Sequence, residues 1–242
     1  PRTEPHNAIF RLVRDYMFGF MYKTVYQTPD ALAYFPKRAQ KNGCVIPNPI
    51  TPNLPKRFEG IRRKEFVTFC RIDKQKNLPM MIDSFVQVHS KYPEYKLRIY
   101  GTGLIETEIK DYIKKKQADK YIIMEGFASK VHESILDCVG FLSSSDYEGL
   151  SNSMLEAMAI GLPCVCTDCP IGGAHMMIQD GVNGLLVPVG DSNAMTAAII
   201  RLIENVDLGT RLSIEAEKVK QFLDENVICK KWESLLYEEN ER

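Results

Sequence analysis

Short apolar runs alternate with longer amphipathic segments from about residue 65 onward. The runs have strand length, and the segments between them carry apolar residues at helical spacing. The predicted strands are Phe66–Cys70, Leu97–Tyr100, Tyr121–Met124, Val139–Leu142, Pro163–Cys166 and Gly184–Val187. The predicted helices are Leu78–Lys91, Ile105–Lys116, Val131–Leu136, Asn152–Ile160, Ala174–Ile178 and Ser192–Asn205. Near-continuous apolar strands separated by helices are typical of a parallel sheet covered on both faces, so we predict an α/β, Rossmann-like, doubly wound domain.

The chain before this domain has a different pattern. Thr28 followed by Pro29 is typical of a helix start, with Thr28 as N-cap and proline in the first turn. The expected elements are a helix over Ala8–Lys23, a strand over Thr24–Thr28, a helix from Pro29 to Ala39 and a strand over Cys44–Ile50. The proline-rich, charged stretch Thr51–Lys64 is the best linker candidate.

The most apolar segment is YMFGFMY, Tyr16–Tyr22. It is far shorter than the roughly 20 residues that span a bilayer, so we predict a buried helix. No signal-peptide pattern is recognisable, and we expect a cytoplasmic protein. The 31 lysines and arginines balance the 31 aspartates and glutamates, so no net basic field attracts nucleic acid. Any bound anion must therefore be held by local groups.

Seven cysteines, mostly in apolar runs, indicate reduced core thiols. Cys164, Cys166 and Cys169, with His175 shortly after them, leave a zinc or redox site as an alternative. Since no second C-x-x-C pair accompanies them, we favour core cysteines.

The first predicted strand ends in CRIDKQKN, which places Arg71 and Lys76 before a helix. Two cations beside a helix N-terminus suit a diphosphate. The alternative is a pair of solvated loop charges.

Glycines follow the next two strands. Gly101 and Gly103 would let backbone approach a ligand closely, but Glu106 stands where a dinucleotide fingerprint needs its third glycine. A dehydrogenase is therefore disfavoured. Gly126 and Phe127 follow the third strand, where a turn with a core phenylalanine is the alternative.

The fourth strand leads into EGLSNSMLEAMAIG, which contains Glu148 and Glu156. On one helix these carboxylates would lie about 12 Å apart, too far for a retaining glycosidase pair. We expect the helix to begin near Ser151–Ser153, which presents the amides of Gly149, Leu150 and Ser151 to an anion. The alternative is a capping box formed by Ser153 and Glu156.

Taken in order, these motifs resemble the donor-binding half of a retaining glycosyltransferase of the GT-B fold, family 4. The resemblance covers about Val45–Tyr237. It is carried by CRIDKQKN, YGTG, MEGF, EGLSNSMLEAMAIGLPCV, GGAHMMIQDGVNGLLVPVGD and a closing helix with Trp232. Two positions depart from the family pattern: Cys70 replaces a glycine, and Met176 stands where an acidic residue is common.

The resemblance implies a nucleotide-sugar donor as substrate, with UDP favoured over GDP or ADP, and neither cofactor nor metal. The absence of an Asp-x-Asp motif agrees with metal independence. It implies catalytic roles for Arg71 and Lys76 on the diphosphate and for Glu148 near the sugar. Glu156 would bind the ribose, and Gly126 and Phe127 would lie by the nucleobase. Gly101 and Gly103 would complete the donor site, with Gly149, Leu150 and Ser151 supplying amides.

The resemblance also implies that most of an N-terminal acceptor lobe is missing. Residues 1–49 would be its remnant, 50–64 the linker, 65–225 the donor-binding domain and 226–242 a C-terminal helix. The acceptor would be a glycan or lipid-linked saccharide, and the complete protein would be free to associate with the inner membrane face. Without the acceptor lobe we expect no sugar transfer. A non-catalytic nucleotide-binding module and a zinc or redox protein are the alternatives.

Overall fold

The structure, a computed structural model, describes residues 8–237. Within that range the large domain is built on a six-stranded sheet in the order β5-β4-β3-β6-β7-β8, with every neighbouring pair parallel. Its strands are β3 (Arg63–Phe69), β4 (Lys96–Tyr100), β5 (Ile122–Gly126), β6 (Cys138–Ser143), β7 (Cys164–Thr167) and β8 (Leu185–Val187). The predicted Rossmann-like domain is confirmed, and β3 begins inside the stretch predicted as linker.

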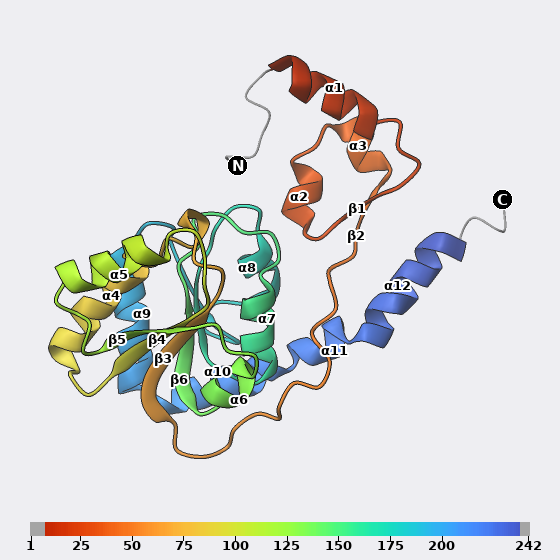
Figure 1. Cartoon of the computed structure of the whole chain (residues 1–242). Coiled ribbons are helices and arrows are strands. Elements are labelled where there is room, and N and C mark those ends of the chain that lie inside the picture. Colours follow the sequence, from red (N-terminus) through yellow and green to blue (C-terminus); the bar gives the residue numbers. More distant parts are fainter. Residues whose placement is uncertain (1–7, 238–242) are drawn as a thin grey trace.

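Helices cover both faces of the sheet (Figure 1). They are α4 (Leu78–Lys91), α5 (Glu106–Lys115), α6 (Val131–Ile135), α7 (Asn152–Ala159), α8 (Gly173–Met177), α9 (Ser192–Glu204), α10 (Val206–Glu217), α11 (Val219–Leu223) and α12 (Glu225–Tyr237). The sequence analysis assigned no helix to α10 or α11, where Gly209 and exposed polar positions weaken the periodic pattern.

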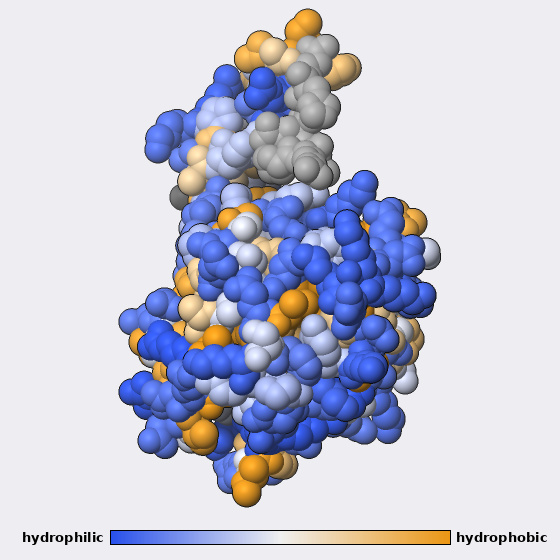
Figure 2. Space-filling model, turned by 90° about the vertical axis from the view of Figure 1, so that its left-hand side faces the viewer, coloured by the Kyte–Doolittle hydropathy of each residue, from blue (hydrophilic) through white to orange (hydrophobic). Residues whose placement is uncertain are grey.

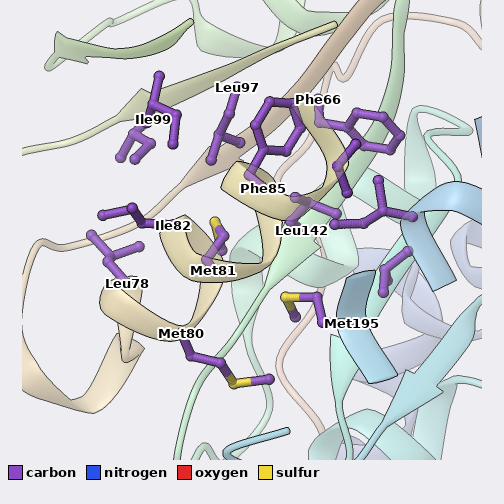
Figure 3. Packing of buried hydrophobic residues seen from close by; sticks show 14 of the residues in the cluster. Phe66, Leu78, Met80, Met81, Ile82, Phe85, Leu97, Ile99, Leu142 and Met195 are labelled. Atoms are coloured by element: carbon purple, nitrogen blue, oxygen red, sulfur yellow. The ribbon is translucent and has the colours of Figure 1, made fainter. Parts of the chain in front are cut away.

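Two apolar clusters lie on the two faces. One joins α4, α5 and α9 to the sheet, with Phe66, Phe85 and Leu97 fully buried (Figure 3). The other joins α7, α11 and α12 to the opposite face. Because both faces are covered, β6 and β7 are buried along most of their length and show apolar runs, as does the second half of β3. β4 and β5 lie toward one edge of the sheet, and they keep charged, partly or fully exposed residues such as Arg98 and Glu125.

The order of the strands reverses between β3 and β6. The chain runs outward from β3 through β4 to β5, then returns to β6 and continues outward to β8. Open α/β sheets bind ligands at the carboxyl ends of the strands beside such a reversal. The loops that follow β3 and β6 are therefore where a site is expected.

A small N-terminal unit lies at the top of Figure 1. It contains α1 (Ala8–Phe18), β1 (Thr24–Tyr26), α2 (Pro29–Ala33), α3 (Lys37–Lys41) and β2 (Gly43–Val45), with β1 and β2 paired in parallel. The predicted Pro29–Ala39 helix is wrong, because Pro36 separates α2 from α3. Thr28 is the predicted N-cap, and its hydroxyl also donates to the carbonyl of Ile171 at 2.7 Å.

The prediction that Tyr16–Tyr22 is buried is wrong. Helix α1 ends at Phe18 and has no buried residue. Apolar side chains gather at the top of the molecule in Figure 2, over this unit. Several apolar residues of this unit are at least 43% exposed, among them Phe10, Leu12, Val13, Tyr16, Met17, Phe20, Met21 and Tyr22. Between residues 8 and 237, no helix combines the length and apolarity that a membrane crossing requires.

Candidate functional site

The loops after β3 and β6 are fastened together at the strand reversal. The amide of Asp146 donates to the carbonyl of Gln75 at 2.9 Å, and the Gln75 side chain donates to the carbonyl of Tyr147 at 2.8 Å. The Asn77 side chain donates to Asp146 at 2.7 Å. Asn77 itself has a left-handed backbone, with φ of 42°, and caps α4. These contacts fix the relative position of two segments that come from different strands.

Lys76 and Glu148 meet across this junction. Lys76 Nζ lies 2.5 Å from Glu148 Oε2, with the side chains 14% and 19% exposed. The Ser145 hydroxyl donates to the same oxygen at 3.1 Å. A charge-assisted pair shielded in this way is stronger than a surface ion pair. The structure therefore brings together two of the three predicted catalytic residues.

Arg71 is placed differently. Its guanidinium is 70% exposed and pairs with Asp73 at 2.5 Å, not with Glu148. It lies at the rim of a groove of about 360 Å³ at the carboxyl ends of β3, β4 and β5. The groove is lined by Phe69, Cys70, Arg71, Tyr100, Gly101, Thr102, Phe127, Ala128 and Val131.

Phe127 is 78% exposed, so the alternative of a core phenylalanine is wrong. Gly126 has a left-handed backbone, with φ of 74°. A ring on the wall of an open groove offers a flat apolar face for stacking. Cys70 is another residue of the groove lining, and burial raises the pKa of its thiol to about 11, so the thiol is neutral rather than nucleophilic.

Gly101 and Gly103 serve close packing of backbone on backbone. A Cβ on Gly101 would lie 1.9 Å from the Cys70 carbonyl oxygen, and one on Gly103 would lie 2.1 Å from that of Ile72. The amide of Ile72 donates to the carbonyl of Thr102 at 2.9 Å. The sequence analysis explained these glycines by approach of a ligand, but the observed neighbour is the loop after β3.

Helix α7 begins where the sequence predicts. Ser151 is its N-cap, and its hydroxyl accepts from the amide of Met154 at 3.4 Å. Leu150 is buried and packs in the apolar cluster on the α7 face of the sheet. Gly149 is packed closely, since a Cβ on Gly173 would lie 1.8 Å from its carbonyl oxygen. The capping-box alternative is wrong, because Ser153 is not the N-cap.

The carboxylate of Glu156 has two partners from distant parts of the chain. Thr51 donates to Oε1 at 2.5 Å, and His132 Nε2 lies 2.9 Å from Oε2. Burial alone raises the pKa of Glu156, but the hydrogen bonds from His132 and Thr51 outweigh it, so the pKa lies below its ordinary value. The sequence analysis did not identify His132 or Thr51, and neither lies in a recognisable motif.

The cysteine-rich segment is part of the core. Cys164, Cys166 and Cys169 are at most 3% exposed. Burial and the negative charge of Glu148 raise the pKa of Cys169 to about 11, which disfavours the thiolate that a metal would need. His175 instead lies between Asp168 and Asp30, at 2.6 and 3.3 Å. Within residues 8–237, no group of three or more His, Cys, Asp or Glu side chains is arranged to hold a metal ion.

Comparison with known proteins adds to this geometry. The family model described as glycosyl transferases group 1 matches residues 63–205, which contain the whole six-stranded sheet and the Lys76–Glu148 pair. The chain belongs to this family.

Glycosyltransferases are also found among its relatives. The GtfA subunit of a UDP-N-acetylglucosamine–peptide N-acetylglucosaminyltransferase from Streptococcus pneumoniae is 25% identical over 213 residues, 84% of this chain and 42% of that protein. A poly(ribitol-phosphate) alpha-N-acetylglucosaminyltransferase from Staphylococcus aureus is 27% identical over 185 residues, 76% of this chain and 37% of that protein. The chain thus spans less than half of each relative.

The crystal structure of Anabaena Alr3699/HepE in complex with UDP has the same fold. It superposes with a TM-score of 0.85 at 20% identity and covers 96% of this chain and 68% of that one. The match extends over nearly the whole chain, which supports assignment of the large domain as a GT-B C-terminal lobe.

Proposed function

We propose that this chain is the donor-binding part of a glycosyltransferase that transfers a sugar from a nucleotide-sugar with retention of configuration, as in family 4. The observation that carries the proposal is the position of Lys76 and Glu148. They meet at the carboxyl ends of adjacent strands, at the strand reversal, within the region that matches the family. A cation with a carboxylate beside it provides one group for a diphosphate and another for a sugar hydroxyl.

Each part of the site has a role in this proposal. The sugar's anomeric carbon loses its bond to the diphosphate oxygen and gains one to the acceptor oxygen on the same face. The acceptor hydroxyl gives its proton to the leaving diphosphate. Lys76, with Arg71 moving in from the rim, neutralises the charge that develops on the leaving diphosphate. Glu148 accepts from the donor sugar, Glu156 accepts from the ribose, and the nucleobase occupies the groove beside Phe127. The backbone amides of Gly149, Leu150 and Ser151 donate hydrogen bonds to the diphosphate.

The relatives and neighbours favour UDP as the nucleotide and retention as the outcome. HepE has been crystallised with UDP, and the pneumococcal relative is named for UDP-N-acetylglucosamine. The staphylococcal relative is named for an alpha linkage, which retention produces from an alpha-linked donor. We propose a glycan or lipid-linked saccharide as the acceptor, held by a second lobe.

Donor binding is testable with residues 1–242. Calorimetric titration with UDP, GDP and ADP should show binding, tightest for UDP, and no binding of any of them at millimolar concentration contradicts the proposal. We expect these residues to bind a donor without transferring its sugar, because the acceptor must be held about 3 to 3.5 Å from the reacting carbon. Sugar transfer by a longer protein that includes an acceptor lobe separates an enzyme from a non-catalytic nucleotide-binding module.

A further inference from the structure

Glu156 is held from two sides. Its Oε1 accepts from the Thr51 hydroxyl at 2.5 Å, and its Oε2 is 2.9 Å from His132 Nε2. An ionised carboxylate only accepts hydrogen bonds and has about four acceptor positions, so Nε2 carries the proton of His132. Each carboxylate oxygen therefore accepts one hydrogen bond and can accept another from a further donor.

His132 is itself fixed against the groove. Its ring meets the ring of Phe69 edge-on, with centroids 5.6 Å apart and planes at 89°. Phe69 and Val131, the neighbour of His132 on α6, both line the groove beside Arg71 and Phe127. The Glu156 carboxylate, 17% exposed, is thus oriented by a residue whose own position depends on the groove wall.

Thr51 comes from another part of the molecule. It lies in the segment that connects the N-terminal unit to β3, and the amide of the preceding residue, Ile50, donates to the carbonyl of Leu223 in α11 at 2.9 Å. This bond holds the connecting segment against the large domain directly beside Thr51. The Thr51 hydroxyl is thereby kept within reach of Glu156.

We propose that His132 and Thr51 are positioning residues that orient Glu156 toward the two hydroxyls of a ribonucleotide. This inference rests on the proposed function, because it takes the ligand of Glu156 to be a ribose. It adds two residues, from α6 and from the connecting segment, that no motif identifies.

The test compares ligands that do and do not present ribose hydroxyls. Thr51→Val and His132→Phe should each weaken UDP binding about three- to tenfold, as expected for loss of one hydrogen bond. Binding of inorganic pyrophosphate should change less than about twofold on the same scale. Thr51→Ser and His132→Gln retain a donor and should restore UDP affinity. Thr107→Val, at an exposed threonine of α5 that does not line the groove, is the matched control.

The outcomes separate this inference from the proposed function. If the wild-type chain binds no nucleotide, the proposed function fails. If it binds UDP and Lys76→Ala weakens binding, but Thr51→Val and His132→Phe behave like Thr107→Val, only the positioning role is overturned. Equal losses for UDP and pyrophosphate would also overturn it, because they indicate a general structural effect. Thr51 is exposed, so its Val and Ser variants keep the test usable if His132→Phe does not fold.

Discussion

Lys76 Nζ and Glu148 Oε2 lie 2.5 Å apart, although 72 positions separate the two residues in the chain. The pair joins the loop after β3 to the loop after β6, where the strand order reverses. In this state the positive charge of Lys76 is directed to a carboxylate of the same protein. A diphosphate must therefore compete with Glu148 for Lys76 or share it.

Removal of the Lys76 charge should weaken nucleotide binding. We expect Lys76→Ala to raise the Kd for UDP about 10- to 100-fold, since one charge-assisted hydrogen bond contributes roughly 1.5 to 3 kcal/mol. Calorimetry measures the effect. Lys74→Ala removes the same charge from an exposed position in the same loop and should change the Kd much less. Equal effects of the two variants would show that only the net charge of the loop matters.

Removal of the Glu148 charge should have opposite effects on binding and stability. Glu148→Gln keeps the shape of the side chain but frees Lys76, so UDP should bind about three- to tenfold tighter. The free energy of unfolding should fall by about 1 to 3 kcal/mol, between the values for exposed and buried pairs. Urea titration and calorimetry measure these changes. Weaker UDP binding would mean that Glu148 holds Lys76 in its binding position.

Substitutions at two glycines should change the free energy of unfolding in opposite directions. At Gly101, φ is 130° and an added Cβ would lie 1.9 Å from the Cys70 carbonyl, so Gly101→Ala should destabilise the fold by more than about 2 kcal/mol. Gly209 lies inside α10 with nothing within 4 Å of an added Cβ. Gly209→Ala should therefore stabilise by about 0.5 to 1 kcal/mol. Similar changes in the midpoint of urea unfolding for both variants would contradict this explanation.

His175 should stabilise the fold mainly at mildly acidic pH. The hydrogen bond to Asp168, and the charges of Asp168 and Asp30, raise its pKa above the ordinary value of 6.5. A raised folded-state pKa gives stabilisation that is complete below the unfolded-state pKa and is lost as pH rises through the folded-state pKa. His175→Gln should lower the free energy of unfolding by about 0.2 to 1 kcal/mol near pH 6 and by less near pH 9. The effect is small because His175 and its two carboxylate partners are exposed.

Urea unfolding at several pH values measures this difference. Asp30→Asn removes one of the two carboxylates beside His175. Its loss of stability should also be larger near pH 6 than near pH 9, but smaller than that of His175→Gln. A gap between wild type and His175→Gln that widens with increasing pH would contradict the assignment.

Nucleotide binding should not depend on a metal ion. In the proposed site the diphosphate charge would be met by Lys76, Arg71 and loop amides, so EDTA should leave the Kd for UDP unchanged. Stoichiometric zinc, lost together with stability in Cys164→Ser and Cys166→Ser variants, would instead support the zinc alternative. Metal analysis of the purified chain distinguishes the two cases.

The sequence by itself determined the fold class and the loops that carry the site. Buried parallel strands need apolar side chains on both faces, so β3, β6 and β7 are visible as short apolar runs of Phe, Val, Leu and Cys. The cations after the first run and the Glu-Gly-Leu-Ser segment after the fourth are also local features. Helix signals act over one turn, which is why Thr28 was identified as an N-cap and the start of α7 was expected near Ser151–Ser153.

Only the tertiary structure decided which of these residues meet. The pairing of Lys76 with Glu148 depends on β3 lying beside β6, and no local pattern encodes the order of strands. The contacts of Glu156 with His132 and Thr51 depend on where α6 and the connecting segment lie against α7. The exposure of α1 also could not be predicted from the sequence. Burial of an apolar segment is favourable, but only the tertiary structure decides whether another element packs over that segment.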